Sequence, residues 1–148
     1  MSMFSALETS GSALAAERQR AEVVAANLAN AHTTRTPGGG PYRRKEVVFA
    51  SSGNFPFRLI ANGHFTLTSG PAPAVWVQRV VTDPTPALVR YEPGHPDADA
   101  KGYVAYPAIN PIQEMVDLMD AVRAYQLNAT AVNAAKQMIQ TSLDILRS

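Results

Sequence analysis

The last part of the chain constrains the fold most strongly, because residues 112–148 contain neither proline nor glycine. Without helix breakers, this stretch can form one helix of roughly 55 Å at 1.5 Å per residue. Apolar residues recur there in two rows with a spacing of seven, the pattern of a coiled coil. One row begins at Met115 and the other at Leu118, and nine of their ten positions are apolar. The sequence therefore predicts a long C-terminal helix that packs against another helix.

Start signals for this helix stand directly before it. Asn110 can cap the first turn, Pro111 suits the first helical position, and Gln113 has the spacing of a capping box. Glu114 then places negative charge near the positive end of the helix dipole. Polar residues near the seam either fix the register between helices or face solvent: Gln126, Asn128, Asn133 and Lys136.

The N-terminal segment repeats this pattern with smaller residues. Residues 1–36 contain one glycine and no proline, and Leu7, Leu14 and Leu28 fall in one row at multiples of seven. Alanines between them favour helix and let a partner helix come close. We therefore predict a first helix that ends near Asn30 and packs against the C-terminal helix.

Proline and glycine gather in the middle of the chain, where all 11 prolines and eight of the nine glycines lie from Pro37 to Pro111. Such a segment favours short strands and loops over helices. The predicted strands are Glu46–Ala50, Phe57–Ile60, Phe65–Thr68, Val75–Val81, Leu88–Tyr91 and Tyr103–Ala105. Apolar residues on both faces of Val75–Val81 predict a strand that is largely covered.

These elements predict an α+β fold that is mainly helical, with long N- and C-terminal helices packed as a coiled-coil-like pair and a small β-rich insertion between them. We divide the chain into a discontinuous terminal-helix domain, residues 1–36 and 108–148, and a β-rich module with connecting loops, residues 37–107. The apolar surface of the C-terminal helix exceeds what one partner helix can cover, which favours association with further chains.

Charge and composition exclude several classes of protein. The 148 residues hold 13 lysines and arginines against 12 aspartates and glutamates, and Arg43-Arg44-Lys45 is a short basic run, so no nucleic-acid partner is expected. No apolar run approaches the ~18 residues that cross a bilayer, so direct membrane insertion is not expected. Cysteine is absent, which excludes disulfides, thiolate zinc sites and cysteine nucleophiles.

Two segments offer weak signals for chemistry. His95, Asp97 and Asp99 alternate donor atoms that could meet a cation, but they lack the glycine and distal glutamate of a calcium loop, and a solvated turn is favoured. Gly38–Gly40 leads into Pro41 and a strand instead of a helix N-terminus, which argues against a phosphate cradle. We therefore predict no catalytic residue, no cofactor, no metal site and no enzymatic activity.

The end of the first helix reads Asn27-Leu28-Ala29-Asn30, which resembles the signature of bacterial flagellar axial proteins of the rod and hook. Further segments resemble, more narrowly, the basal-body rod proteins of the proximal rod. These segments are Gly11–Ala16, Pro41–Phe49 with Tyr42, Tyr91-Glu92-Pro93-Gly94-His95-Pro96, Ala98–Val104 with Gly102 and Tyr103, Glu114–Asp117 and Arg123–Asn128. Thr33–Gly40 and Asn54–Val89 carry no such resemblance.

The resemblance implies a structural subunit of the flagellar rod, the drive shaft that joins the motor's membrane ring to the distal rod and hook. Such subunits polymerise through their terminal helices, transmit torque and carry no catalytic residues. The implied partners are copies of the chain itself, other proximal and distal rod subunits, a rod adaptor at the membrane ring, and the flagellar type III export apparatus during secretion. The implied location is the rod in the periplasmic space, reached without a cleaved signal peptide.

The residues predicted to pack helices together in the assembly are apolar seam positions: Leu7, Leu14, Leu28, Met115, Leu118, Val122, Tyr125, Val132, Ile139, Leu143 and Leu146. Two alternatives stay open. One is another rod or hook subunit, since the Asn-Leu-Ala-Asn signature is shared. The other is a small periplasmic enzyme or ligand-binding module in the unmatched segment, which would need acid–base or metal groups such as His95, Asp97 and Asp99.

Overall fold

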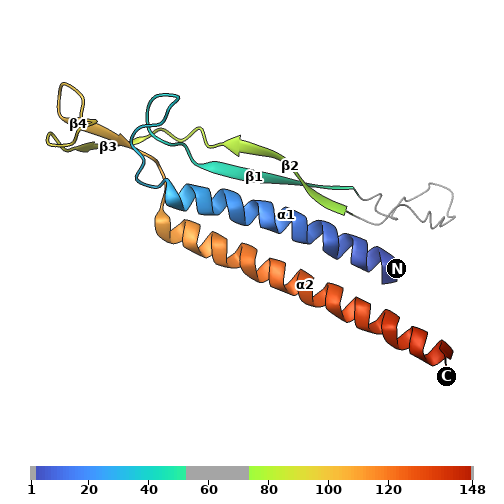
Figure 1. Cartoon of the computed structure of the whole chain (residues 1–148). Helices are drawn as coiled ribbons and strands as arrows, with labels where there is room; N and C mark the ends of the chain where they lie inside the picture. Colours follow the sequence, from blue (N-terminus) through green and yellow to red (C-terminus); the bar gives the residue numbers. More distant parts are fainter. Residues whose placement is uncertain (1–2, 53–73, 148) are drawn as a thin grey trace, which may run out of the picture.

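The computed structural model describes residues 3–52 and 74–147, and Figure 1 shows two long helices with strands along one side. The elements in chain order are α1 (Met3–Ala29), β1 (Lys45–Ser52), β2 (Ala74–Thr82), β3 (Leu88–Tyr91), β4 (Tyr103–Tyr106) and α2 (Pro111–Arg147). This order confirms the predicted fold class, long terminal helices around a small β-rich insertion. The predicted strands Phe57–Ile60 and Phe65–Thr68 lie outside the described residues.

The helices α1 and α2 lie side by side in opposite directions, so the end of α1 and the start of α2 are neighbours (Figure 1). Asn110 caps α2 as predicted, because its Oδ1 accepts a hydrogen bond from Ile112 N at 3.0 Å. The Gln113 amide does not complete a capping box but donates along the helix to Asp117 Oδ1 at 3.5 Å. In the part of the chain that the structure describes, neither helix has the apolar stretch that a bilayer span requires.

The strands form two separate antiparallel ladders. β1 pairs with β2 along its whole length, with a register shift between Val48 and Phe49. This ladder lies along α1, where Ser12 Oγ accepts a hydrogen bond from Val75 N at 3.0 Å. β3 pairs with β4, with Tyr91 opposite Tyr103. Each ladder has only two strands, so its stability depends on the helix or loops against which it packs.

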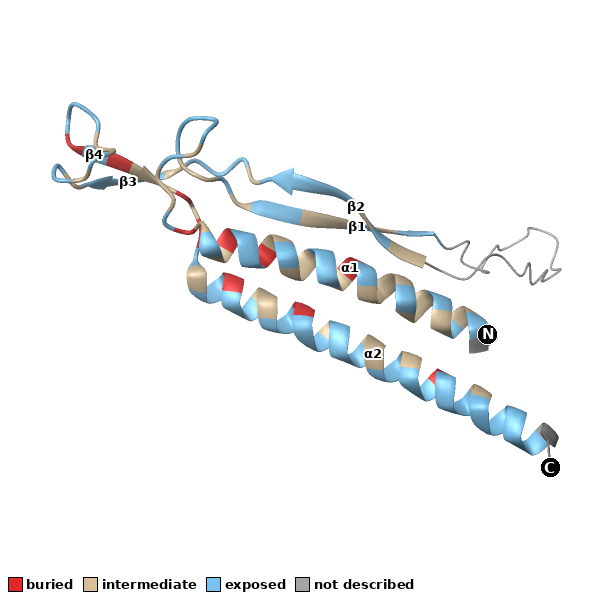
Figure 2. Ribbon diagram, viewed as in Figure 1, coloured by how far each residue is buried: buried red, intermediate tan, exposed pale blue. Residues whose placement is uncertain are grey.

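The core consists mainly of small side chains. Figure 2 shows that the buried positions of α2 lie on the side that faces α1. The buried apolar residues are Ala16 and Val24 of α1, Ala121 and Ala135 of α2, Val104 of β4, and Ala31 and Ile109 in the connections. Small side chains let the two helix backbones approach closely, because they do not hold the helices apart.

The seam between the helices differs from the predicted row that begins at Met115. Within the chain, Met115, Val122 and Leu143 are exposed, whereas Ala121 and Ala135 are buried. The contact face of α2 therefore uses the small residues of the neighbouring row and leaves a row of large residues outside. Three members of the second predicted row are half-buried: Leu118, Val132 and Ile139.

The prediction that Val75–Val81 is covered on both faces is wrong. Trp76 is 45% exposed and Val80 is 48% exposed. A two-stranded ladder that packs on a single helix can bury one of its faces at most, and no second layer lies over the other face in the described residues.

Candidate assembly site

Asn27, the first residue of the signature, is fully buried where α1, β1 and α2 meet. Its Nδ2 donates hydrogen bonds to Lys45 O at 2.8 Å and to Glu114 Oε2 at 3.0 Å. Its Oδ1 accepts hydrogen bonds from Lys45 N at 2.9 Å and from Tyr42 Oη at 3.2 Å. The amide thus uses both of its donors and both acceptor positions. It ties the start of β1 and the start of α2 to the end of α1.

Glu114 is buried in the same place, with 1% of its side chain exposed. Its Oε1 lies 2.5 Å from Arg44 Nε. The Arg44 guanidinium also pairs with Glu46 and reaches Asp117 Oδ2 at 3.4 Å. A buried carboxylate is costly unless it is paired and hydrogen-bonded, and Glu114 meets both conditions. We call this group the polar junction: Asn27, Tyr42, Arg44, Lys45 and Glu114.

Burial and charge shift two pKa values in the polar junction. Burial acts to lower the pKa of Arg44, but the hydrogen bond to Glu114 and the charges of the neighbouring carboxylates raise it above its usual value. Burial, followed by the charge of Glu114, raises the pKa of Tyr42 above its ordinary 10.0. At neutral pH the junction therefore holds a charged guanidinium and a neutral phenol.

The loop between α1 and β1 folds back so that β1 starts beside the end of α1. Tyr42 N donates a hydrogen bond to Thr33 O at 3.0 Å, which brings the two ends of the loop together. At the tip of the loop, Gly39 and Gly40 have φ values of 84° and 73°. Glycine adopts this left-handed region without the steric cost that other residues meet, so the tight return is compatible with this sequence.

The other signature residues close the last turn of α1. Asn30 Nδ2 donates to Ala26 O at 2.9 Å, and Asn30 Oδ1 accepts from Thr33 Oγ1 at 3.1 Å. Leu28 is half-buried and Ala29 is exposed. The two asparagines therefore act differently: Asn27 joins distant elements, and Asn30 satisfies the helix end locally.

The family segment that starts at Tyr91 lies on the β3–β4 ladder. The rings of Tyr91 and Tyr103 meet edge to face, with centroids 5.3 Å apart. Glu92 Oε2 accepts a hydrogen bond from Tyr106 Oη at 2.7 Å. These cross-strand contacts hold the small ladder together without a large core.

Gly102 adopts a φ of 81° directly before β4. A Cβ atom at this position would lie 2.9 Å from Tyr91 Cε2 and 3.1 Å from Pro93 Cβ. Both the backbone conformation and the close neighbours therefore require glycine here. Gly94 differs, because a Cβ atom there would meet open space within the described residues.

The histidine and aspartates of the candidate metal loop form the turns before β4. Asp97 Oδ2 accepts from Thr34 Oγ1 at 2.7 Å, and Asp99 Oδ1 accepts from Tyr103 N at 2.8 Å. His95 Nδ1 accepts from Asp97 N at 3.1 Å. Residues 3–52 and 74–147 contain no group of three side chains arranged for a metal ion. The hydrogen bonds of His95 and Asp99 show that the segment forms turns, and the absence of a metal site stays a prediction.

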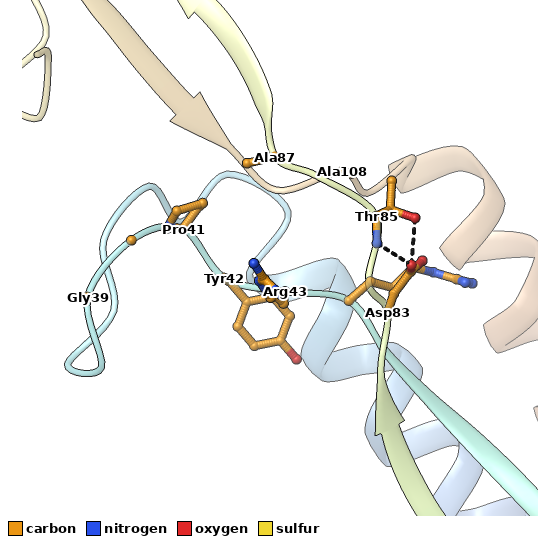
Figure 3. Close-up of a pocket in the computed structure, with 10 residues that line it drawn as sticks. Gly39, Pro41, Tyr42, Arg43, Asp83, Thr85, Ala87 and Ala108 are labelled. Carbon is orange, nitrogen blue, oxygen red and sulfur yellow. Dashed lines mark hydrogen bonds between the residues drawn. The ribbon is translucent and has the colours of Figure 1, made fainter.

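A small pocket lies where the 39–44 loop meets the connection from β2 to β3 (Figure 3). It encloses about 160 Å³, and Tyr42, Arg43 and Asp83 are among the residues that line it. The Asp83 carboxylate accepts hydrogen bonds from Thr85 N at 2.8 Å and from Thr85 Oγ1 at 2.5 Å. These bonds lower the pKa of Asp83, so the carboxylate is held ionised and is not poised for proton transfer at neutral pH.

The predicted assembly residues divide into half-buried and exposed groups. The half-buried ones are Leu7, Leu14, Leu28, Leu118, Val132 and Ile139. The exposed ones are Met115, Val122, Tyr125 and Leu143. The side chain of Leu146 lies outside the described residues. Packing of the exposed group between subunits stays a prediction, and its members remain accessible for it in the single chain.

Among the polar residues near the seam, three are exposed: Gln126, Asn133 and Lys136. Asn128 is half-buried, and its Nδ2 donates to Ala124 O of its own helix at 2.9 Å. Within the chain, these side chains therefore do not pair α2 with α1 and do not set the register between them. The polar junction at the end of the helices does so instead.

Sequence reasoning missed the pairing of Arg44 with Glu114. It assigned Glu114 to the helix dipole, and Arg44 entered only as part of a short basic run and a family segment. One signal was available, because Glu114 lies seven residues before Ala121 and fourteen before Asn128, in the row that faces α1. A charged residue on the packed face of a helix needs a partner, and arginine is the residue best suited to a buried pair.

Comparisons of the sequence with known proteins give matches to flagellar rod proteins. A family model described as flagella basal body rod protein matches residues 7–35, and one described as flagellar basal body rod FlgEFG protein C-terminal matches residues 100–145. The chain is 40% identical to the flagellar basal-body rod protein FlgC of Borreliella burgdorferi, over 99% of each chain. It is also 40% identical to FlgC of Bacillus subtilis, over 98% of this chain and 99% of the relative, and to FlgC of Escherichia coli O157:H7, over 98% of each.

Proposed function

The chain belongs to the FlgC family of flagellar basal-body rod proteins and is a structural subunit of the rod, and on this premise we propose that it builds the wall of the proximal rod with its two terminal helices. It assembles there with other rod components. In this proposal, α1 and α2 pack first against each other and then against the helices of neighbouring subunits, so that torque passes from the motor to the distal rod and hook.

The observation that carries the proposal is the exposed apolar surface that α2 keeps after it has packed on α1. Seven of its large apolar residues are at least 42% exposed in its first half: Ile112, Met115, Val116, Met119, Val122, Tyr125 and Leu127. These exposed side chains do not stabilise a single chain in water, because apolar surface contributes to stability only when it is buried. Contiguous apolar surface of this kind is typical of a protein interface.

The polar junction supports a role of the helix pair in the transmission of torque. Asn27 and Glu114 fix the angle and register at which α2 leaves the β-rich part, through bonds that only one alignment satisfies. A shaft that transmits torque needs such fixed relations between its parts, because a loose joint would absorb rotation. In the assembled rod, the β-rich part would then set the orientation of each subunit.

The proposed partners are further copies of the chain, the neighbouring proximal and distal rod subunits, and an adaptor at the membrane ring. The flagellar type III apparatus would export the chain to the periplasmic space without a cleaved signal peptide. We propose no enzymatic activity, in line with relatives that are named as flagellar basal-body rod proteins. The residues that line the pocket in Figure 3 support this view, because Asp83 is the carboxylate among them and Thr85 already holds it.

Quantitative mass spectrometry of purified basal bodies tests the proposal. The hook and filament are stripped, and the chain should be retained at a stoichiometry comparable with that of other rod proteins. Absence of the chain from otherwise complete rods would overturn the proposal. The Leu143→Glu variant replaces an exposed apolar residue of α2 by a charge and should fold but be depleted from rods, whereas Gln126→Glu, which adds the same charge at an exposed position that is already polar, should be retained.

A further inference from the structure

The β3–β4 ladder stands apart from the helices and from the other ladder. Within the part of the chain that the structure describes, neither of its strands packs on a helix or on the β1–β2 ladder (Figure 1). All four residues of β3 are exposed, and Val89 and Tyr91 keep 65% of their surface accessible (Figure 2). A two-stranded ladder is marginally stable in water, and a third strand stabilises such a sheet. Among the described residues, no such strand is present.

The backbone of β3 presents an open edge on the side away from β4. One position beyond the paired strands, Glu92 N donates a hydrogen bond to Gly102 O at 2.9 Å, towards the β4 side. Backbone directions alternate along a strand, so the N–H and C=O groups of Val89 and Tyr91 point outward. Within the described residues, no hydrogen bond outside the ladder reaches these groups.

The opposite edge of the ladder, along β4, is already covered. Tyr103 O accepts a hydrogen bond from Asp99 N at 2.8 Å, and Tyr103 N donates to Asp99 Oδ1 at 2.8 Å. The turn before β4 thus occupies the outward backbone groups at the start of that strand. The two edges therefore differ, and a further strand has access to β3 and not to the covered part of β4.

The charge of β3 selects the strand that fits its open edge. Arg90 lies between the two outward-pointing residues, is exposed, and stacks over Tyr106 with Cζ 5.2 Å from the ring centroid. It forms no ion pair with a described carboxylate, and Glu92 on the same face instead accepts from Tyr106 Oη at 2.7 Å. A strand added to β3 places one residue directly opposite Arg90, where an acidic side chain is favourable and a basic one is unfavourable.

The described strands of a second copy do not meet this requirement. When two β3 strands pair through both outward residues of each, their Arg90 side chains lie opposite each other, which is repulsive. β1 carries an acidic residue, Glu46, but the backbone N and O of the neighbouring Lys45 already bond to Asn27. β2 and β4 contain no acidic residue. These observations favour a segment of a different protein.

We propose that the open edge of β3 accepts an extended segment of another protein as a third strand, and that this segment carries an aspartate or glutamate opposite Arg90 with an apolar residue on each side of it. The backbone of Val89 and Tyr91 supplies the hydrogen bonds, and the side chains of both residues contact the apolar neighbours. The inference goes beyond the proposed function, because it concerns the β-rich part and not the terminal helices.

Photo-cross-linking of the full chain in its assembly identifies the segment. Val89 is replaced by p-benzoylphenylalanine in cells that lack the native copy, purified basal bodies are irradiated, and the cross-linked peptides are sequenced by mass spectrometry. We expect a peptide of another protein with an apolar–acidic–apolar run at the attachment site. A synthetic peptide of that sequence should bind the purified native chain, and replacement of its acidic residue by lysine should weaken binding about threefold or more.

Two variants at position 89 separate backbone pairing from side-chain contact. Val89→Pro removes the outward N–H, which an edge strand tolerates, whereas Val89→Thr keeps it. Proline should weaken binding of the synthetic peptide about tenfold or more, and threonine less than about threefold. Hydrogen exchange of the Val104 amide, which pairs with Arg90 inside the ladder, checks that the ladder is intact. If proline opens the ladder, the acidic and lysine peptides on the native chain decide.

The remaining outcomes overturn the inference. A cross-link from position 89 to a second copy of the chain would replace the other protein as occupant. Attachment to a segment without an acidic residue, equal binding of the acidic and lysine peptides, or equal binding to intact proline and threonine variants would each reject it. Rods that retain the chain without a cross-link at position 89 would also reject it, while the proposed function stands. Absence of the native chain from rods would reject the proposed function alone, and irradiation of intact cells would then decide the inference in the same way.

Discussion

Asn27 Nδ2 lies 3.0 Å from Glu114 Oε2, and this buried hydrogen bond joins the last turn of α1 to the first turn of α2 across 87 positions of the sequence. The same amide pairs with the backbone of Lys45, so one side chain positions three elements. The coupling explains why an asparagine suits position 27: a short amide supplies two donors and an acceptor from a single point.

Replacement of Asn27 by alanine should therefore destabilise the whole fold. The Glu114 carboxylate would lose a partner in a buried place and the Lys45 backbone in a partly buried one, and an unsatisfied buried group costs about 1–3 kcal/mol. Urea denaturation followed by circular dichroism measures the change. The matched variant Asn30→Ala removes two local hydrogen bonds, one exposed and one partly buried, and should cost less than about 1 kcal/mol. Equal effects of the two variants would show that the junction contributes no more than a helix end.

Glu114→Gln keeps the size of the side chain but removes the charge opposite Arg44. The ion pair is largely buried, and removal of one partner from a buried pair costs about 3 kcal/mol. The double variant with Arg44→Gln should lose less than the sum of the single variants, with a coupling of about 1–3 kcal/mol in a double-mutant cycle. Additive losses would mean that the 2.5 Å contact between the two side chains does not stabilise the protein.

The sequence predicted the helices and the described strands well, because their signals are local. The absence of proline and glycine, the Asn110 cap and the apolar periods each act within a few residues, and β3 has the predicted bounds Leu88–Tyr91. The polar junction is different, since Arg44 and Glu114 are separated by 70 positions. The residues around one of them do not indicate that the other is its partner. Its recognition requires the path of the loop from α1 to β1.

The seam illustrates a second limit of sequence reasoning. The heptad count favours the largest apolar residues, and so it selected Met115 and Val122 for the helix contact. The structure buries Ala121 and Ala135 instead. Small side chains let the two helices come closer than a row of large side chains would, and closer helices bring more atoms into contact. A helix with two apolar stripes offers both choices, and only tertiary packing decides which stripe faces inward.

Gly102→Ala should destabilise the β3–β4 ladder locally. The residue has a φ of 81°, where a side chain is strained, and a new Cβ would lie 3.1 Å from Pro93 Cβ. We expect a loss of about 1 kcal/mol or more. Amide hydrogen exchange of β3 and β4 reports it. Gly94→Ala, which would meet open space, should leave exchange unchanged. Faster exchange in both variants would indicate that the ladder tolerates no side chain in either turn.

Tyr42 should make stability fall at alkaline pH. Its pKa is raised by burial and by the charge of Glu114, so its contribution is fully present below the unfolded value near 10.0 and is lost as the pH rises through the higher folded value. Tyr42→Phe removes the titrating group together with the hydrogen bond to Asn27. This variant should be less stable than the native chain at about pH 7 but show a shallower decline towards about pH 11. Parallel declines in urea titrations would exclude Tyr42 as the source.

Ala121→Leu tests whether close packing of small residues holds the two helices together. Ala121 has no exposed surface, so the extra three carbons must displace α1 or strain the side chain, which costs about 1–3 kcal/mol in well-packed cores. Ala131→Leu is the matched control, because position 131 lies on the same helix and is exposed. Leucine is nearly as good a helix former as alanine, so the control should change the free energy of unfolding by less than about 0.5 kcal/mol. Thermal and urea unfolding of both variants measure the two changes in stability. A stabilised Ala121→Leu chain would contradict the prediction, because it would mean that the helices leave room between them. The large residues outside could then replace the small ones inside.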